Sequence, residues 1–289
     1  MLDQLVHLLG YDFVQNAIAA GVVIGIVAGV VSRFVVARSM AFAVHALAEL
    51  GFTGAAGAIV IGLSPVIGLL AGTTITALFI GALGIRARER DAVVGVVMAF
   101  GLGLGVFFLA IYPRYATEAF AILFGTITGV SRTDVILLVA IGIATLVAVA
   151  VVYRPLTFAT VDPEVAEARG VPVAALAVVF LLILAAAVAE AVQVVGVLLI
   201  LTLLITPGAA AERLTAKPGR AAAYSVLIAL TCVLGGIGLA LVTDIPVSVF
   251  VTSISFAWYL VARFVLGPLA MGSEGRRPVA PPATAPHHH

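Results

Sequence analysis

The sequence predicts an all-α, polytopic membrane protein, and its composition and the length of its apolar runs carry that prediction. Of 289 residues, 63% are hydrophobic and 10% are charged, whereas a soluble globular protein has about 25% charged residues. Apolar runs of about 20 residues, the length at which a helix crosses the hydrocarbon core of a bilayer, recur along the chain. The opening stretch MLDQLVHLLGYD has no Lys or Arg and so lacks the charged start of a cleavable signal peptide. We therefore expect the first apolar run to stay in the membrane.

The apolar runs divide the chain into about nine candidate spans. Eight crossings remain possible, because the joins near Pro65 and Gln193 are short enough for two runs to form one bent pair. The approximate bounds are 13–36, 43–62, 65–85, 92–112, 133–153, 172–190, 192–208, 221–242 and 246–267.

The distribution of basic residues predicts the orientation, because Lys and Arg concentrate in cytoplasmic loops. With the N-terminus outside and the C-terminus in the cytoplasm, every basic residue except Arg114 and Arg132 falls on the inner side. These two flank YATEAFAILFGTITGVS, a broken apolar stretch that we expect to be a re-entrant or interfacial helix on the outer face.

The chain outside the spans adds little. We expect one transmembrane domain over residues 1–268 and a disordered Pro/Ala-rich tail over 269–289, whose three final histidines resemble a purification tag. The single cysteine, Cys232, lies in an apolar run and excludes a disulfide framework or a cysteine metal cluster.

Two acidic residues, Glu49 and Glu190, fall within apolar runs rather than in loops. A charge near the bilayer centre costs about 2.5–3.5 kcal/mol on insertion scales, so an intramembrane carboxylate suggests function. His45 lies four residues before Glu49, and on a helix the two side chains share a face. They could hold a divalent cation together, or only hydrogen-bond to each other. Glu190 is either a solvated helix end near the outer face or a metal-entry ligand.

The inner loop after the span at 133–153 predicts a short helix within residues 161–171. Asp162 suits the residue before the helix, Pro163 its first position and Glu164 its first turn, and Gly170 ends it. Such a helix could dock a cytosolic partner or be a capped connector.

Five segments resemble the permease subunit of the zinc/manganese/iron ABC importers, the ZnuB-like family, over about residues 11–268. They are VDPEVAEARGVPVAAL (161–176), VVGVLLILTLLITPGAAAERL (194–214), RERDAVVGVV (88–97), LFGTITGVSRTD (123–134) and TDIPVS (243–248). Each lies in its expected topological place. Family members commonly have Asp and His four residues apart where this chain has His45 and Glu49, so the ligand types are exchanged while their spacing is kept.

The resemblance implies a bacterial-type multi-pass permease of the cytoplasmic membrane. Two copies would form a core within membrane lipid, with a cytosolic ATP-binding-cassette ATPase below and an extracytoplasmic metal-binding protein above. Nucleic acid is not an expected partner. The cargo would be zinc or manganese, possibly iron, and no permanent cofactor is expected. By this resemblance the cation path includes His45 and Glu49. Glu190 is a further candidate ligand, on the ground of its place in an apolar run alone. The segment that couples to the ATPase comprises Asp162, Pro163, Glu164, Ala166, Arg169 and Gly170.

The sequence itself agrees that the motor is a separate chain, because it contains no G-x-x-x-x-G-K-[ST] phosphate loop. A transport subunit is therefore expected rather than an enzyme. The alternatives are an intramembrane metalloenzyme using His45 and Glu49, a metal carrier driven by an ion gradient, and import of siderophore or cobalamin.

Overall fold

The computed structural model describes residues 11–83, 87–111, 132–197, 200–243 and 245–266, and these ranges contain helices and turns without a strand. The tail over 269–289 and the expected re-entrant segment lie outside the described residues. The helices are α2 (Asp12–Ala37), α3 (Ala41–Val60), α4 (Pro65–Leu83), α5 (Ala87–Ile111), α7 (Arg132–Val161), α8 (Pro163–Ala168), α9 (Val173–Val195), α10 (Ile200–Leu214), α11 (Pro218–Ala240), α12 (Val247–Val261) and a final π-helical turn, η3 (Ala262–Leu266).

Seven described helical stretches are long and apolar enough to cross a membrane: α2, α3, α4, α7, α9, α11 and α12 continued into η3. A shorter apolar stretch, Ala92–Phe108, lies in α5. The prediction of a polytopic all-α protein is confirmed. Helices are the expected solution because lipid offers no hydrogen-bond partner to an open backbone, so each spanning segment must satisfy its own amides.

The predicted span over 192–208 differs from the structure. The break falls at Gly196, whose φ of +86° lies in the left-handed region, and α9 continues to Val195 before it. The next helix, α10, runs only from Ile200 to Leu214, a rise of about 22 Å that is shorter than the hydrocarbon core of about 30 Å.

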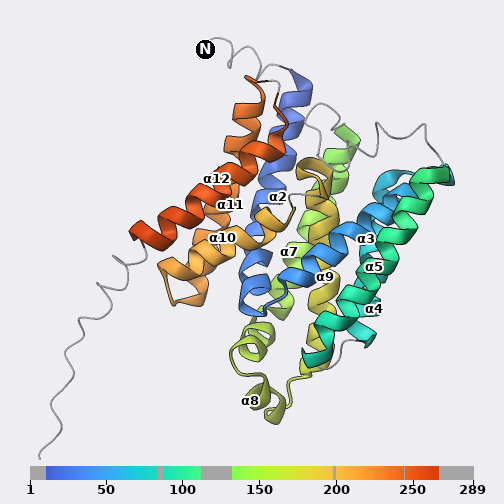
Figure 1. The fold of residues 1–289 in the computed structure, drawn as a ribbon. Coiled ribbons are helices and arrows are strands. Elements are labelled where there is room, and N and C mark those ends of the chain that lie inside the picture. Colours follow the sequence, from blue (N-terminus) through green and yellow to red (C-terminus); the bar gives the residue numbers. More distant parts are fainter. Residues whose placement is uncertain (1–10, 84–86, 112–131, 198–199, 244, 267–289) are drawn as a thin grey trace, which may run out of the picture.

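The helices form one bundle around α2, which packs against α7, α9, α10 and α11, while α3, α4 and α5 form a second group that joins the first through α9 (Figure 1). Close approach between α3 and α4 depends on glycine. A Cβ atom on Gly54 would collide with the backbone carbonyl oxygen of Gly68. Small residues let helix backbones approach closely in lipid, where van der Waals contact drives association.

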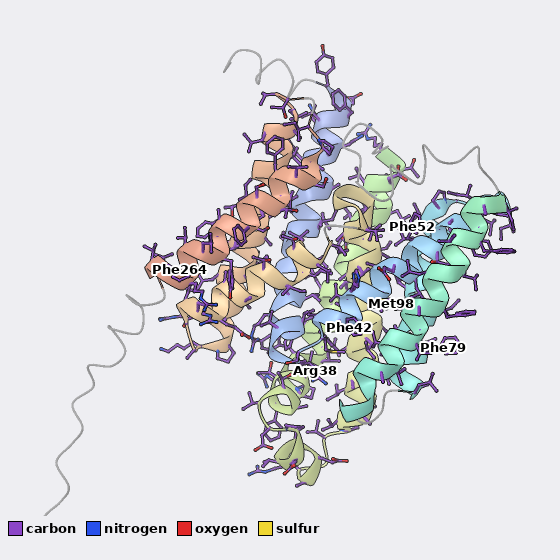
Figure 2. The ribbon with its side chains drawn as sticks, in the orientation of Figure 1. Arg38, Phe42, Phe52, Phe79, Met98 and Phe264 are labelled. Atoms are coloured by element: carbon purple, nitrogen blue, oxygen red, sulfur yellow. The ribbon has the colours of Figure 1, made fainter. Side chains whose placement is uncertain are left out.

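The outer surface of the bundle is apolar. Figure 2 shows Phe79 of α4 and Phe264 of η3 on opposite sides of the molecule, and they are 54% and 67% exposed. Large exposed apolar side chains would be unfavourable in water, but they are the expected surface where lipid is the solvent. The starting end of α2 and the α11–α12 connection lie at the top of Figure 1, and α8 lies at the bottom.

Candidate functional site

The turn between α2 and α3 positions the first candidate pair. Ser39 lies in the left-handed region with φ +53°, and the N–H of Met40 donates to the carbonyl of Val35 at 2.9 Å. This bond closes the end of α2 in the way usual for a helix that stops at a left-handed residue. Met40 is buried, so the turn is anchored in the core and α3 begins at Ala41 in a fixed direction.

His45 and Glu49 contact each other on α3. The Nε2 atom of His45 lies 3.1 Å from the Oε1 atom of Glu49, with the two side chains 37% and 17% exposed. The predicted shared face is therefore confirmed, whereas a metal-binding role is not tested by this geometry. The pair is therefore only partly covered by the rest of the described chain.

Glu49 keeps spare capacity to accept hydrogen bonds or bind a cation. Its Oε2 atom is buried and has no hydrogen-bond partner among the described residues. One turn further along α3, the hydroxyl of Thr53 lies 3.1 Å from the Glu49 carbonyl and 2.9 Å from the Gly101 carbonyl of α5. Thr53 thus ties the helix carrying the pair to its neighbour, and the carboxylate is left with an unpaired oxygen.

The described part of the chain does not gather enough ligands for a closed metal site. Within the described ranges, no group of three or more His, Cys, Asp or Glu side chains could hold a metal ion. An imidazole nitrogen and a carboxylate oxygen are suitable first-row metal ligands, but closed sites have four or more. The structure therefore does not gather His45, Glu49 and Glu190 into one cluster.

Glu190 lies inside the bundle, which contradicts its interpretation as a solvated helix end. It is 0% exposed, and neither carboxyl oxygen has a hydrogen-bond partner among the described residues. The Oε1 atom points at Gly142 of α7, because a Cβ built there would lie 2.8 Å from it and 2.5 Å from Val23 of α2. The carboxyl group thus occupies space between α2, α7 and α9 that a glycine leaves free.

The predicted short helix after α7 is confirmed as α8, from Pro163 to Ala168. The carboxylate of Asp162 accepts from the Val165 N–H at 3.0 Å, and Gly170 has φ +81°. Of the predicted coupling residues, Glu164, Arg169 and Gly170 are exposed while Ala166 is buried. α8 packs against α7 and α9, so it is connected directly to two long helices.

Sequence reasoning missed two polar contacts inside the bundle. Arg33, expected at the inner surface, is 7% exposed, and its Nη1 donates to the hydroxyl of Tyr153 at 3.1 Å. The Ser32 hydroxyl accepts from the Gly208 N–H at 2.8 Å, just after Pro207 interrupts the amide series of α10. The signal for the second contact was Pro207, because a proline inside a helix disrupts the backbone hydrogen bonds around it. The Ser32 hydroxyl also donates to the Ile205 carbonyl at 3.3 Å.

Comparison with known proteins gives a consistent family signal. Residues 10–266 match the family described as the ABC 3 transport family. The chain is 30% identical to a "Manganese transport system membrane protein MntC" of Halalkalibacterium halodurans, and the match covers 89% of each chain. It is 31% identical to a "Manganese import system permease protein ScaB" of Streptococcus parasanguinis, covering 70% of this chain and 72% of that protein.

Solved structures agree on the fold. A chain of PsaBC from Streptococcus pneumoniae, solved in complex with Fab, has a TM-score of 0.84 at 25% identity, covering 95% of this chain and all of that one. An inward-facing putative metal-chelate type ABC transporter has a TM-score of 0.69 at 17% identity and covers 87% of each chain, which shows likeness of fold alone.

Proposed function

This chain belongs to the ABC 3 transport family, and we propose that it is the membrane-spanning permease of an ATP-driven importer of divalent metal, with manganese as the main cargo. The chain is a transport component rather than an enzyme. Manganese is favoured over zinc and iron because the two relatives described above carry manganese transport in their names. One observation of this structure carries the proposal: an imidazole and a carboxylate in contact on a partly exposed face of α3.

The cation would pass His45 and Glu49. Manganese accepts oxygen and imidazole ligands and binds less tightly than later first-row metals, which suits a site that must release its ion. In a core of two copies related by a two-fold axis, the pair would be duplicated across the path and give two imidazoles and two carboxylates. The unpartnered Oε2 of Glu49 would be an additional ligand atom.

Glu190 would act as a second, later-engaged ligand. In the described arrangement its carboxyl faces Gly142 and the valines of α2 rather than a cluster of ligands. A separation of α7 or α2 from α9 would give the carboxyl access to the path. An intramembrane carboxylate is costly to bury without a partner, which favours a role in the transport cycle over simple packing.

Coupling to the motor would run through α8. A cytosolic ATPase pair would contact its exposed side chains, including Glu164 and Arg169. Since α8 packs on both α7 and α9, closure of the ATPases would push two long helices at once and switch access to the path from outside to inside. This requires the N-terminus outside and an extracytoplasmic metal-binding protein above the opposite end.

The test is cell-associated manganese, zinc and iron, measured by mass spectrometry in a host that lacks its own importer. The host receives the permease with its ATPase and binding protein, as wild type, as Glu49→Gln or as Glu212→Gln. Glu212 is an exposed carboxylate on α10 and serves as the matched control. We expect selective manganese accumulation that Glu49→Gln removes and Glu212→Gln leaves unchanged.

Two other results would change the proposal. Accumulation of none of the three metals by the intact complex would reject the importer, and selective zinc accumulation would correct the cargo. If Glu49→Gln leaves manganese uptake unchanged at equal membrane abundance, His45 and Glu49 have a structural role and no role in transport.

A further inference from the structure

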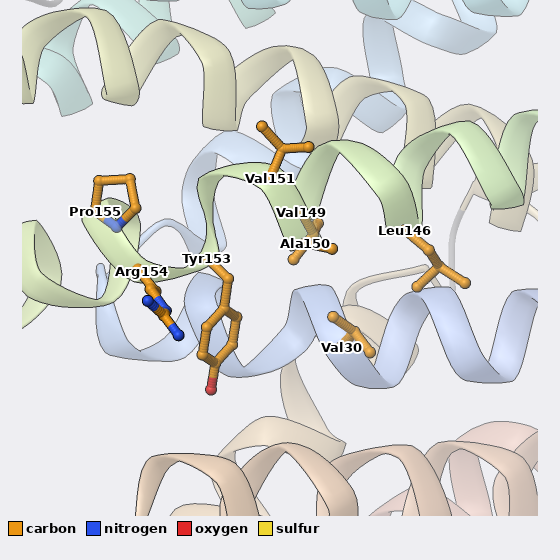
Figure 3. Close-up of a pocket in the computed structure, with 8 residues that line it drawn as sticks. All are labelled: Val30, Leu146, Val149, Ala150, Val151, Tyr153, Arg154 and Pro155. Carbon is orange, nitrogen blue, oxygen red and sulfur yellow. The ribbon is translucent and has the colours of Figure 1, made fainter.

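A groove between α2 and α7 has the shape and chemistry of a lipid site. It has a volume of about 550 Å³ and is lined by Val30 of α2 and by Leu146, Val149, Ala150, Val151, Tyr153, Arg154 and Pro155 of α7. Figure 3 shows Val30 facing Leu146 and Ala150, with Tyr153 and Arg154 together at one end. The groove is thus apolar along most of its length and cationic at one end.

The depth of Arg154 matches the level of lipid headgroups. Arg132 begins α7 and Arg154 follows 22 residues later, a rise of about 33 Å that fits a hydrocarbon core of about 30 Å between the two guanidinium groups. Tyr153 beside it is a residue type enriched at membrane interfaces, and its hydroxyl is held by Arg33. From Arg154 the groove runs toward the bilayer centre past Val149 and Leu146, along the path of an acyl chain.

Charge in the groove favours an anion. Arg154 is the one charged side chain among the lining residues, and none of them is acidic. Its side chain is exposed, and within the described part of the chain no hydrogen bond or ion pair holds its guanidinium. A guanidinium group matches the geometry of phosphate oxygens well.

Lipid is a better occupant for this groove than a second copy of the chain. α7 is the most apolar of the seven candidate spans, and only 22% of its most apolar stretch is buried, as expected for a helix that faces hydrocarbon. A second copy would need an anion at headgroup depth to meet Arg154, whereas lipid phosphates are already present there.

We propose that the groove between α2 and α7 binds one anionic phospholipid, with its phosphate on Arg154 and one acyl chain along Val30, Ala150 and Leu146. On the orientation proposed above, this lipid belongs to the cytoplasmic leaflet. It would fill the space between the central helix α2 and the helix α7 that precedes α8, and so stabilise their spacing.

The test is native mass spectrometry of the full-length chain released from nanodiscs that contain equal amounts of phosphatidylglycerol and phosphatidylcholine. Wild type is compared with Arg154→Gln, Arg154→Lys and Ala150→Trp, which places a bulky ring in the groove. Arg132→Gln, at the opposite end of the same helix, is the matched control. Each variant's oligomeric state is measured by light scattering.

We expect one retained phosphatidylglycerol per chain in wild type, Arg154→Lys and Arg132→Gln. Arg154→Gln should lower retention about fivefold, the effect of one arginine near a lipid surface, and Ala150→Trp should lower it at least as much. Equal retention of phosphatidylcholine, or retention unchanged in both Arg154→Gln and Ala150→Trp, would overturn the site. Loss of a dimer in these two variants, in place of lipid loss, would assign the groove to a second copy of the chain.

Discussion

Glu49 on α3 and Glu190 on α9 are both carboxylates within membrane-spanning helices, but their surroundings are opposite. Glu49 lies 3.1 Å from a histidine nitrogen and its side chain is 17% exposed. Glu190 is 0% exposed, and neither of its oxygens has a partner among the described residues. One carboxylate is paired on an accessible face, and the other is enclosed against Gly142.

The two regions accommodate a carboxylate in different ways. The α3 pair offsets part of its polarity through a contact between neighbouring turns, although the Oε2 atom of Glu49 has no partner among the described residues. Glu190 depends on three helices and on the absence of a side chain at position 142. A carboxyl group that is costly to bury suggests a function for Glu190. The His45–Glu49 pair is compatible with either a structural or a functional role.

The largest expected effect on stability is at the buried carboxylate, Glu190. Replacing Glu190 with Leu should raise the free energy of unfolding by about 3 kcal/mol, because an unpaired polar group leaves an apolar site, and should lower metal uptake. Unfolding can be followed in mixed SDS micelles by the fluorescence of Trp258, the single tryptophan. Glu212→Leu, on the surface of α10 and attracted by Arg33 and Arg213, should not raise the free energy of unfolding, because it removes a carboxylate that has cationic neighbours. A clear loss of stability in Glu190→Leu would show that the carboxyl has a stabilising partner.

The next effect concerns the space that Glu190 occupies. Gly142→Ala should lower the free energy of unfolding by about 2 kcal/mol, because its Cβ would press on Val23 and on the Glu190 carboxyl. Gly103→Ala is the matched control, since nothing lies within 4 Å of a Cβ there, and alanine in a helix should stabilise by up to about 1 kcal/mol. Equal changes in the free energy of unfolding for the two variants would mean that the contact between α2, α7 and α9 can accommodate an extra methyl group at position 142.

A smaller effect is expected at Ser39, in the turn that precedes α3 and its His45–Glu49 pair. Ser39→Gly should raise the free energy of unfolding by about 1 kcal/mol, because Ser39 has φ +53° and only glycine adopts that region without steric cost. The control Ser253→Gly, in the helix interior of α12, should instead be slightly destabilising. Destabilisation by Ser39→Gly would indicate that the serine side chain itself supports the turn before α3.

The smallest expected effect on stability is at His45, where we expect a large effect on uptake. His45→Gln should change the free energy of unfolding by less than about 0.5 kcal/mol, the contribution of a pair between neighbouring helical turns. Manganese uptake should fall at least about tenfold, since losing even an outer partner of a metal ligand has that effect. Ala41→Gln places the same amide one turn away on α3 and should leave uptake unchanged. Large destabilisation with normal uptake per folded molecule would make the pair structural.

Much of the fold could be predicted because lipid imposes a local rule. A run of about 20 apolar residues must form a helix to satisfy its own backbone, and α2 and α4 accordingly lie within two residues of their predicted bounds. The shared face of His45 and Glu49 follows from the helical repeat alone, and the capped start of α8 at Asp162 follows from local backbone chemistry.

The apolar helices, the residues that begin and end them, and the paired side chains on α3 all depend on residues close together in the chain, and for that reason they could be predicted. The packing of the folded bundle, in contrast, determines that α9 extends to Val195 while α10 stays short, that Arg33 is buried against Tyr153, and that Glu190 is enclosed by α2 and α7. These features depend on which faces of distant helices meet. A helical repeat identifies the residues that share a face, but the partner of that face is fixed by packing across the whole bundle.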